Sequence, residues 1–468
     1  MFCIFAESKY TTMKNNRSLA ISSKIQECKM GNIIGVLENV VPSSIFEDYK
    51  SDNKSRNRVF SNRTTLLTMV LSSVQQDKTL KNSVDLFYSI HQDHRKSLIN
   101  ELEEEARIQK ELDEKKNLKR RGRHKLYKVQ LNKSLTDDIS LNTAAYSKAR
   151  KRLPIQLVEN LFKASLIDNA QNQYTHFHKR RVSIVDGTYL QMQDSEQLRE
   201  LYEVKHKNHS VEGYPQGLLV VEIERGSGII TNYKLSNRHT SELASFYEML
   251  DNITPGSLVL ADDLYNCYEI FAKCIRLNID ILVPAKRARN YEVIEVLGEG
   301  DEIVKIKAPL ERSKWLKTKE NNTPILLRRI ECISPEGEKY CLMTTITDKK
   351  ILKEEYQNLY LTRWDVEISI REIKTIMDIN VLRSLTPEMI IKELLVSLAT
   401  YNLIRKMIYA SIKDLPFFPK DDFIQKYYTF HQDILIDKKG RVYNRWSSGR
   451  RRAETNNNNS SSPKKVTE

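Results

Sequence analysis

The sequence has few cysteines and no long apolar run. Its 6 cysteines among 468 residues form no CxxC pair, so neither a zinc finger nor a disulfide scaffold is predicted, and reduced thiols are expected. No stretch approaches the roughly 18 consecutive apolar residues that a membrane span requires. The opening MFCIFAES is apolar over too few residues to predict a signal peptide. We therefore expect a protein of the cytosol that has no membrane partner.

The charge balance is basic. Lys and Arg number 75 against 61 Asp and Glu, which gives a formal net charge of +14. Such an excess favours an anionic partner, nucleic acid before membrane, although solubility alone also accounts for it. A chain of 468 residues has room for about two or three domains.

Periodicity divides the chain into regions of different texture. A helical pattern comes first, and it is followed by strands and helices in the order β, β, β, α, β, α, β, which predicts an α/β fold with a mixed sheet and flanking helices. A stretch with antiparallel character interrupts that pattern. The expected regions are an N-terminal segment (1–32), a helical DNA-binding domain (33–154), a catalytic domain (178–284 and 349–412), a β-rich insertion (285–348) and a C-terminal region with a disordered basic tail (413–468).

One predicted helix in the first domain is strongly basic. The segment SLNTAAYSKARKRLP is helical up to Pro154, which ends it. Basic helices of this kind often lie along nucleic acid phosphates, and a purely structural helix explains the pattern equally well. Its candidate DNA-binding residues are Lys148, Arg150, Lys151 and Arg152. The preceding charge run, 101–128, predicts a solvated acidic helix and then a basic arm for phosphate contacts.

Three carboxylates stand at places suited to a metal site. Asp186 closes the first strand of the expected sheet, in RVSIVDGT, and Asp262 ends the fourth, in GSLVLADD. The first and fourth strands of such a sheet can be neighbours, beneath a later helix that carries Glu367. Converging carboxylates repel one another unless a cation is present, and hard oxygen ligands favour Mg²⁺, for which Mn²⁺ can substitute. Two such ions would serve phosphodiester chemistry.

Each carboxylate also has an ordinary structural explanation. Asp186 suits a turn or a cap, Asp262 suits a helix cap, and Glu367 suits an ion pair with Arg363 at i,i+4. The surrounding segment YLTRWDVEISIREIK, read as one helix, places Tyr360, Arg363, Glu367 and Lys374 within one narrow arc. That face would present a carboxylate for metal beside groups that grip phosphate oxygens.

The joint pattern resembles the DDE transposases of the IS-four insertion-sequence family. Their signature is Tyr, two residues, Arg, three residues, Glu, six residues, Lys, and this chain has Tyr360, Arg363, Glu367 and Lys374 at those spacings. The resemblance extends to VDGTYLQM, SNRHTSE, VLADDLYNCYEIF and TAAYSKARKRLP, over roughly 32–409. Relatives often carry Arg where this chain has Asp263, which leaves open whether Asp262 or Asp263 points inward; we favour Asp262.

The resemblance implies an RNase H-like catalytic core with Asp186, Asp262 and Glu367 as the metal-binding triad. It also implies that Tyr360, Arg363 and Lys374 contact DNA phosphates. An aromatic residue of the insertion, Trp315, would stack on an unpaired or flipped base, with packing as the alternative.

The implied activity is cut-and-paste DNA transposition. Its partners would be double-stranded DNA, both the terminal inverted repeats of the element and the target, and a second copy of the chain in a synaptic complex, in the bacterial cytosol or nucleoid. Two alternatives stay open. One is an RNase H-like nuclease without strand transfer, and the other is a non-catalytic DNA-binding protein derived from a transposase.

Overall fold

Two compact units divide the computed structural model, Met1–Lys406 and Met407–Glu468. In the second unit, β12 (Leu435–Ile436) pairs antiparallel with β13 (Val442–Tyr443). The expected segment 1–32, most of the charge run 101–128 and the expected basic tail lie outside the described residues. The described residues are 59–89, 142–166, 176–202, 213–286, 290–311, 313–316, 323–333, 337–375 and 377–413, with short pieces at 41, 44–46, 104, 107–108, 111, 435–436 and 442–443.

The first unit is built on a large mixed sheet. Three strands form an antiparallel meander, and two more are added in parallel beside the first of them. In spatial order the five are β4 (Ile230–Asn237), β3 (Gln216–Glu224), β2 (Arg180–Met192), β5 (Leu258–Leu260) and β6 (Asp280–Pro284). Gly226 and Gly228 have φ of 87° and 70° in the β3–β4 turn, a conformation that glycine adopts without steric cost. The predicted hairpin and the predicted order of elements are confirmed.

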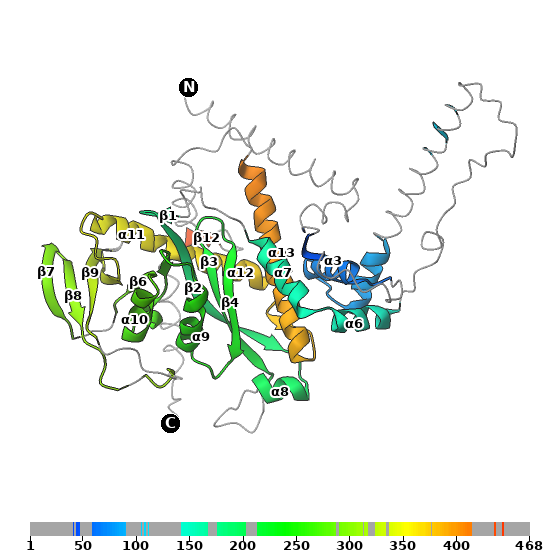
Figure 1. Ribbon diagram of the computed structural model, residues 1–468, viewed down its shortest axis with the longest axis horizontal. Helices are drawn as coiled ribbons and strands as arrows, with labels where there is room; N and C mark the ends of the chain where they lie inside the picture. The colour runs from blue at the N-terminus through cyan, green and yellow to red at the C-terminus, as the bar shows by residue number, and fades with distance from the viewer. Residues whose placement is uncertain are drawn as a thin grey trace, which may run out of the picture. The chain divides into compact units, whose positions relative to one another are not determined.

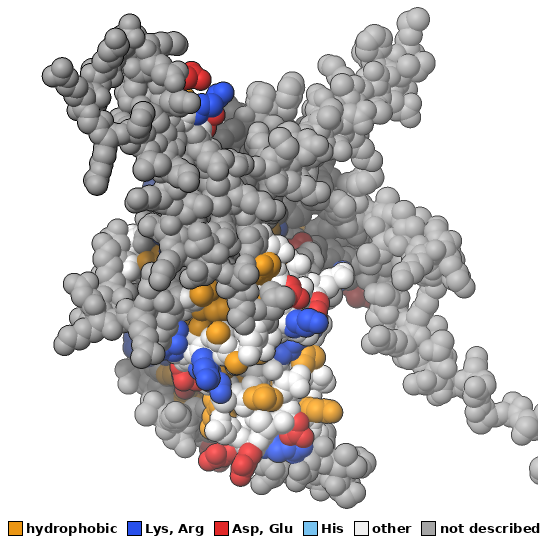
Figure 2. Space-filling model, turned by 90° about the vertical axis from the view of Figure 1, so that its right-hand side faces the viewer, with side chains coloured by type: hydrophobic (Ala, Val, Ile, Leu, Met, Phe, Trp, Pro, Cys, Tyr) orange, Lys and Arg blue, Asp and Glu red, His pale blue; other side chains and the backbone are white. Residues whose placement is uncertain are grey.

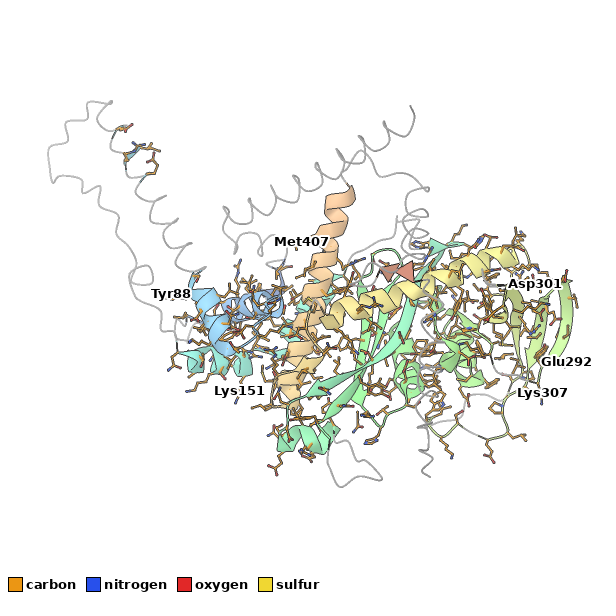
Figure 3. The ribbon with its side chains drawn as sticks, turned by 180° about the vertical axis from the view of Figure 1, so that it is seen from behind. Tyr88, Lys151, Glu292, Asp301, Lys307 and Met407 are labelled. Carbon is orange, nitrogen blue, oxygen red and sulfur yellow. The ribbon has the colours of Figure 1, made fainter. Side chains whose placement is uncertain are left out.

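Helices cover both faces of this sheet. Val185 packs in one apolar cluster with Phe246 of α9 (Glu242–Met249) and Phe271 of α10 (Tyr268–Arg276). The adjacent Ile184 packs in the other, which also holds residues of the helices on the opposite face, because successive side chains of a strand point to opposite faces. α9 and α10 lie on one face (Figure 1) and the later helices on the other (Figure 3). These are α11 (Lys353–Leu361), α12 (Asp365–Thr375) and α13 (Pro387–Lys413).

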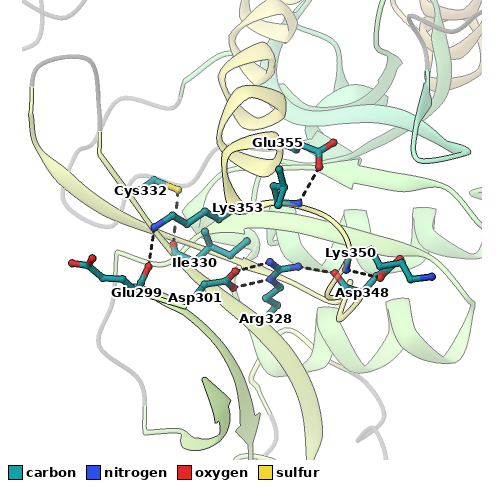
Figure 4. A network of polar contacts seen from close by, with 10 residues as sticks. Glu299, Asp301, Arg328, Ile330, Cys332, Asp348, Lys350, Lys353 and Glu355 are labelled. Atoms are coloured by element: carbon teal, nitrogen blue, oxygen red, sulfur yellow. Dashed lines mark hydrogen bonds and ion pairs between the residues drawn. The ribbon is translucent and has the colours of Figure 1, made fainter. Parts of the chain in front are cut away.

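The β-rich stretch extends this sheet at its β6 edge. Its strands are antiparallel as expected, and β10 pairs with β6, so they continue the main sheet. Arg328 ties two of them together: its guanidinium is 2.8 and 2.6 Å from the two carboxylate oxygens of Asp301, and it donates to the Asp348 carbonyl at 2.7 Å (Figure 4). The strands are β7 (Glu292–Gly298), β8 (Asp301–Ile306), β9 (Ile325–Ile333) and β10 (Lys339–Thr344).

The helices near the N-terminus form a small packed group. Ser61 caps the first of them through the Thr64 amide at 3.1 Å, and Phe60 packs against Phe87 and Tyr146. The group comprises α3 (Asn62–Ser73), a helix at 80–89, α6 (Thr143–Arg152) and α7 (Ile155–Ser165). In the described part of the chain, no helix has the length and apolarity to cross a membrane.

Smaller elements complete the first unit. Two short strands flank β2: β1 pairs with it antiparallel and β11 in parallel. In the described part that follows α7, the other connections include a helix and three 3-10 turns. Their bounds are β1 (His176–Phe177), β11 (Val381–Leu382), α8 (Glu196–Tyr202), η3 (Leu250–Asn252), η4 (Asp263–Tyr265) and η5 (Thr362–Trp364).

Candidate active site

Asp186 and Asp262 lie at the same end of two neighbouring strands. β2 and β5 run parallel, and their last registered pair is Ile184 with Leu260. Asp186 and Asp262 each follow that pair by the same number of residues. Both acids therefore lie at the same end of the β2–β5 pair. Both side chains are half-buried. The expectation that the first and fourth strands are neighbours is confirmed.

The expectation that the first strand ends at Asp186 and Gly187 was wrong. β2 continues to Met192, and Gly187 pairs with Val220 of β3. An Asp-Gly pair often marks a turn because glycine tolerates positive φ, but Gly187 is not among the residues with positive φ. Asp186 therefore sits within a long strand, at the point where its parallel partner β5 ends.

The two adjacent acids Asp262 and Asp263 have different surroundings. Asp262 accepts a hydrogen bond from the Leu264 amide at 2.8 Å and caps η4, so the predicted capping role is present. Asp263 accepts from the Lys286 amide at 2.9 Å. The charge of Asp262, together with that of Asp186, acts on the buried Tyr265. This shared effect on Tyr265 favours Asp262, and the choice between the two acids stays a prediction.

Glu242 is a third carboxylate in this region, and the sequence reasoning did not single it out. It accepts a hydrogen bond from the Tyr265 hydroxyl at 2.5 Å. Burial raises the pKa of Glu242, the Tyr265 hydrogen bond lowers it, and the charges of Asp186 and Asp262 raise it further. Its position in the SNRHTSE segment was the available signal, but only the packing of α9 on the sheet brings it to the two aspartates.

Gly187 makes room for the Glu242 carboxyl. A Cβ at position 187 would lie 2.5 Å from Glu242 Cδ, so Gly187→Ala should displace that carboxyl and break its bond with Tyr265. We expect a loss of about 1 kcal/mol in the free energy of unfolding, measured by urea titration. In a Glu242→Ala background the same change should stabilise by about 0.5–1 kcal/mol, because alanine is favoured over glycine in a strand. If Gly187→Ala changes the free energy of unfolding equally in wild type and in Glu242→Ala, residue 187 does not contact the Glu242 carboxyl.

The Tyr360 to Lys374 segment is not one continuous helix, contrary to expectation. Tyr360 lies in α11, Arg363 in η5 and the remainder in α12. At the break, the Thr362 hydroxyl donates to the Leu359 carbonyl at 2.7 Å and accepts from Arg225 at 3.0 Å. A threonine that bonds back to the preceding turn competes with regular helix geometry, so the single-arc argument does not hold as stated.

Tyr360 and Arg363 nevertheless lie beside the acids. The Tyr360 hydroxyl donates to the Ala261 carbonyl at 3.2 Å, next to Asp262. The Arg363 guanidinium lies over the Tyr360 ring, with its Cζ 5.8 Å from the ring centroid, and the residue is buried. Burial raises the pKa of Tyr360 well above its usual range, so the phenol stays protonated near neutral pH.

α12 packs beside β2, which brings the backbone of Glu367 toward the strand that carries Asp186. The Glu367 side chain lies outside the described part of the structure, and Lys374 is half-buried in the last turn of α12. Among the described residues, no group of three His, Cys, Asp or Glu forms a metal-binding cluster. The role of Glu367 thus stays a prediction.

The remaining candidates differ in exposure. Lys148, Lys151 and Arg152 are exposed, and Arg152 also donates to the Phe60 carbonyl at 3.2 Å. Arg150 is half-buried and lies over the Tyr146 ring at 5.9 Å. Figure 2 views the side on which α6 lies, and on its described surface basic side chains are interspersed with acidic and apolar ones. The DNA contacts of these four residues stay predictions.

Trp315 is partly buried. Its ring makes an edge contact with Tyr247 at 5.8 Å and packs against the core on the α9 and α10 face. This contact agrees with the alternative role expected for Trp315, packing within the protein. A stacking role on a base stays a prediction.

Comparisons with known proteins find similarity over the part of the chain that contains this site. Residues 177–403 match the family described as transposase DDE domain. The chain is 27% identical over 274 residues to transposase InsG for insertion sequence element IS4 of Escherichia coli (strain K12), a match that covers 56% of this chain and 60% of that protein's length.

Two solved structures are distant in shape. A piggyBac transposase synaptic complex with hairpin DNA has a TM-score of 0.36 at 9% identity, covering 79% of this chain and 71% of that one. The Mos1 strand transfer complex has a TM-score of 0.15 at 12% identity, covering 50% and 62%. The family match includes Asp186, Asp262, Glu367 and the whole Tyr360 to Lys374 signature. Over residues 177–403 the chain is therefore similar to the transposase DDE domain, and over 274 residues it is similar to an IS4 transposase.

Proposed function

We propose that this chain is a DNA transposase that excises and inserts an insertion-sequence element by metal-dependent phosphodiester cleavage and strand transfer. The observation that carries the proposal is the placement of Asp186 and Asp262 at the same end of the adjacent parallel strands β2 and β5. The DDE domain that contains them supports it, and so does α12, which packs beside β2 and carries Glu367.

We further propose that the catalytic domain is RNase H-like. A three-stranded antiparallel meander, extended by two parallel strands beside its first strand, is the arrangement that the resemblance implies. The β-rich stretch 285–348 would be the insertion of this domain, and 33–154 its helical DNA-binding domain.

The residues present suit a hard divalent cation. Asp186 and Asp262 offer carboxylate oxygens, the donors that Mg²⁺ and Mn²⁺ prefer. Burial raises the pKa of Glu242 and the charges of these two acids raise it further, so both acids act on the space around Glu242, where a cation would offset their repulsion. Asp186, Asp262 and Glu367 would hold it. When bound, such ions supply activation of the attacking oxygen and stabilisation of the leaving oxygen of a phosphodiester.

The neighbouring cationic and phenolic groups would hold the DNA end. Arg363 and Lys374 would contact phosphate oxygens, as guanidinium and ammonium groups do. Tyr360 is fixed next to Asp262 by its hydrogen bond to Ala261, so a phosphate held there would lie close to the metal-binding acids. This arrangement orients the strand without moving a proton through Tyr360, whose pKa is raised by burial.

Two exposed lysines of α6 provide a test of the helical domain. The double variant Lys148→Ala, Lys151→Ala should lower the slope of log affinity against log salt by about 1 for each phosphate that is no longer neutralised. Affinity for a fragment carrying the element end is measured across a salt series. Lys163→Ala, at an exposed position of α7, serves as the matched control. If the double variant has the same salt slope as wild type, these two lysines of α6 do not contact DNA phosphates.

A cleavage assay tests the proposed reaction as a whole. Purified full-length chain is incubated with a fragment bearing the element's terminal repeat and with target DNA, in Mg²⁺ or Mn²⁺. Nicking at the element end followed by joining to target supports the transposase. Nicking without joining would indicate a nuclease, and end binding without cleavage in either metal would indicate a DNA-binding protein. The reaction on two ends calls for a homodimer in a synaptic complex, which would act on DNA in the bacterial cytosol or nucleoid.

A further inference from the structure

A polar cavity lies near the start of β5, away from the proposed active site at its end. Its volume is about 470 Å³, within the range of small-molecule sites, about 300–1,000 Å³. Asp262 follows the end of β5, whereas Ser257 of the cavity precedes its start. The lining residues are Leu166, Arg181, Ser183, Glu222, Glu224, Thr231, Asn252, Thr254 and Ser257.

Two buried carboxyl groups dominate the cavity. Glu222 and Glu224 alternate along β3, so both project to the same face, and they are 6% and 1% exposed. Arg181 neutralises Glu224 through a contact of 2.6 Å, and the Ser227 hydroxyl also donates to Glu224 at 2.5 Å. Within the described residues, no lysine or arginine forms an ion pair with Glu222; burial raises the pKa of this carboxyl, and the Ser183 and Thr231 hydroxyls and the charge of Arg181 only partly offset that rise. The cavity therefore holds two carboxyl groups against one guanidinium, a balance that disfavours an anionic ligand.

An unsatisfied hydroxyl lines the same cavity. Ser183 is 4% exposed, and its Oγ makes no well-aligned hydrogen bond among the described residues, although it lies close enough to Glu222 to lower the pKa of that carboxyl. Buried polar atoms without partners are uncommon in folded proteins, and they indicate a missing water, ion or ligand. Ser183 and Glu222 together offer acceptor oxygens to a group that donates several hydrogen bonds.

We propose that this cavity binds a small organic cation of the alkyl diamine or polyamine class. A primary ammonium has three donors and no acceptor, which matches the Ser183 hydroxyl and the Glu222 carboxyl, because a cation beside a buried carboxyl favours its charged form. Its methylene chain would pack on Leu166 and on the methyl groups of Thr231 and Thr254. The volume would hold roughly 15 waters at about 30 Å³ each, far more space than a single metal ion occupies. This site is separate from the DDE acids and does not depend on the proposed reaction.

Calorimetry and thermal unfolding of the full-length chain with putrescine or spermidine, without DNA, test the proposal. Wild type should show saturable binding and a rise in Tm. The chain's net charge of +14 opposes non-specific uptake of cations, so binding would report a defined site. Glu222→Gln should weaken the affinity at least tenfold and Ser183→Ala a few-fold. Glu248→Gln, which changes a half-exposed carboxylate of α9 paired with Lys234, should bind like wild type.

The proposal fails if wild type shows no saturable binding, or if Glu222→Gln binds as tightly as wild type. It also fails if MgCl₂ gives the same Tm rise and the same dependence on Glu222, because the site would then take a metal ion. Ser183→Ala keeps the carboxyl pair, so it separates loss of binding from misfolding if Glu222→Gln proves unstable.

Discussion

Replacing Asp262 with asparagine should lower the rate of DNA-end cleavage by about three orders of magnitude, whereas Asp263→Asn should leave it within about threefold of wild type. A thousandfold loss corresponds to about 4 kcal/mol of transition-state stabilisation, the scale expected when a charged metal ligand is lost. Asparagine at position 262 can still accept from the Leu264 amide and is a favourable cap, so η4 should stay folded. The rate is measured on a labelled terminal fragment in Mg²⁺.

Asp263 is a matched control because it lies next in the chain and also accepts from a backbone amide, that of Lys286. Both variants therefore keep a local hydrogen bond and lose one negative charge. The reverse result, with Asp263→Asn inactive and Asp262→Asn active, would show that the residue at the position where relatives carry arginine is the ligand. Similar modest losses in both variants would argue against a metal role for either residue.

Much of the site could be predicted because strand order follows from local patterns. Apolar runs, glycine turns and the alternation with helices indicate which segments are strands and how they connect, and these placed Asp186 and Asp262 on neighbouring parallel strands. The two acids then lie at the same end of the sheet because parallel strands end on the same side, and their convergence on one metal site stays a prediction. The inference that these two strands are neighbours needs no side-chain detail, and the structure confirms it.

The features that the sequence reasoning missed depend on contacts between distant segments. β2 continues past Gly187 because β3 pairs with it and α9 brings Glu242 against it, although Asp-Gly by itself favours a turn. The break at Thr362 depends on Arg225 from the β3–β4 turn. The β-rich stretch joins the main sheet through pairing of β10 with β6. Local periodicity carries no information on such pairings.

The Glu367→Gln variant should cleave DNA at least about a thousandfold more slowly than wild type, the same loss as expected for Asp262→Asn. Its affinity for the element end should stay within about threefold of wild type. Glutamine preserves the size and helix propensity of the residue and removes the charge that would hold the metal. Cleavage is followed in Mg²⁺ and in Mn²⁺, and binding by mobility shift in Ca²⁺.

Glu372→Gln is the matched control for that variant, because Glu372 lies on the same helix but its carboxylate faces Tyr401 at 3.3 Å and Arg405 at 3.8 Å. Because the Glu372 carboxylate is engaged by residues of α13, this variant should cleave at nearly the wild-type rate. Undiminished cleavage by Glu367→Gln would refute its place in the triad. Loss of end binding together with cleavage would instead assign Glu367 to an ion pair that holds the helix, since a metal ligand is not needed for the phosphate contacts that dominate affinity.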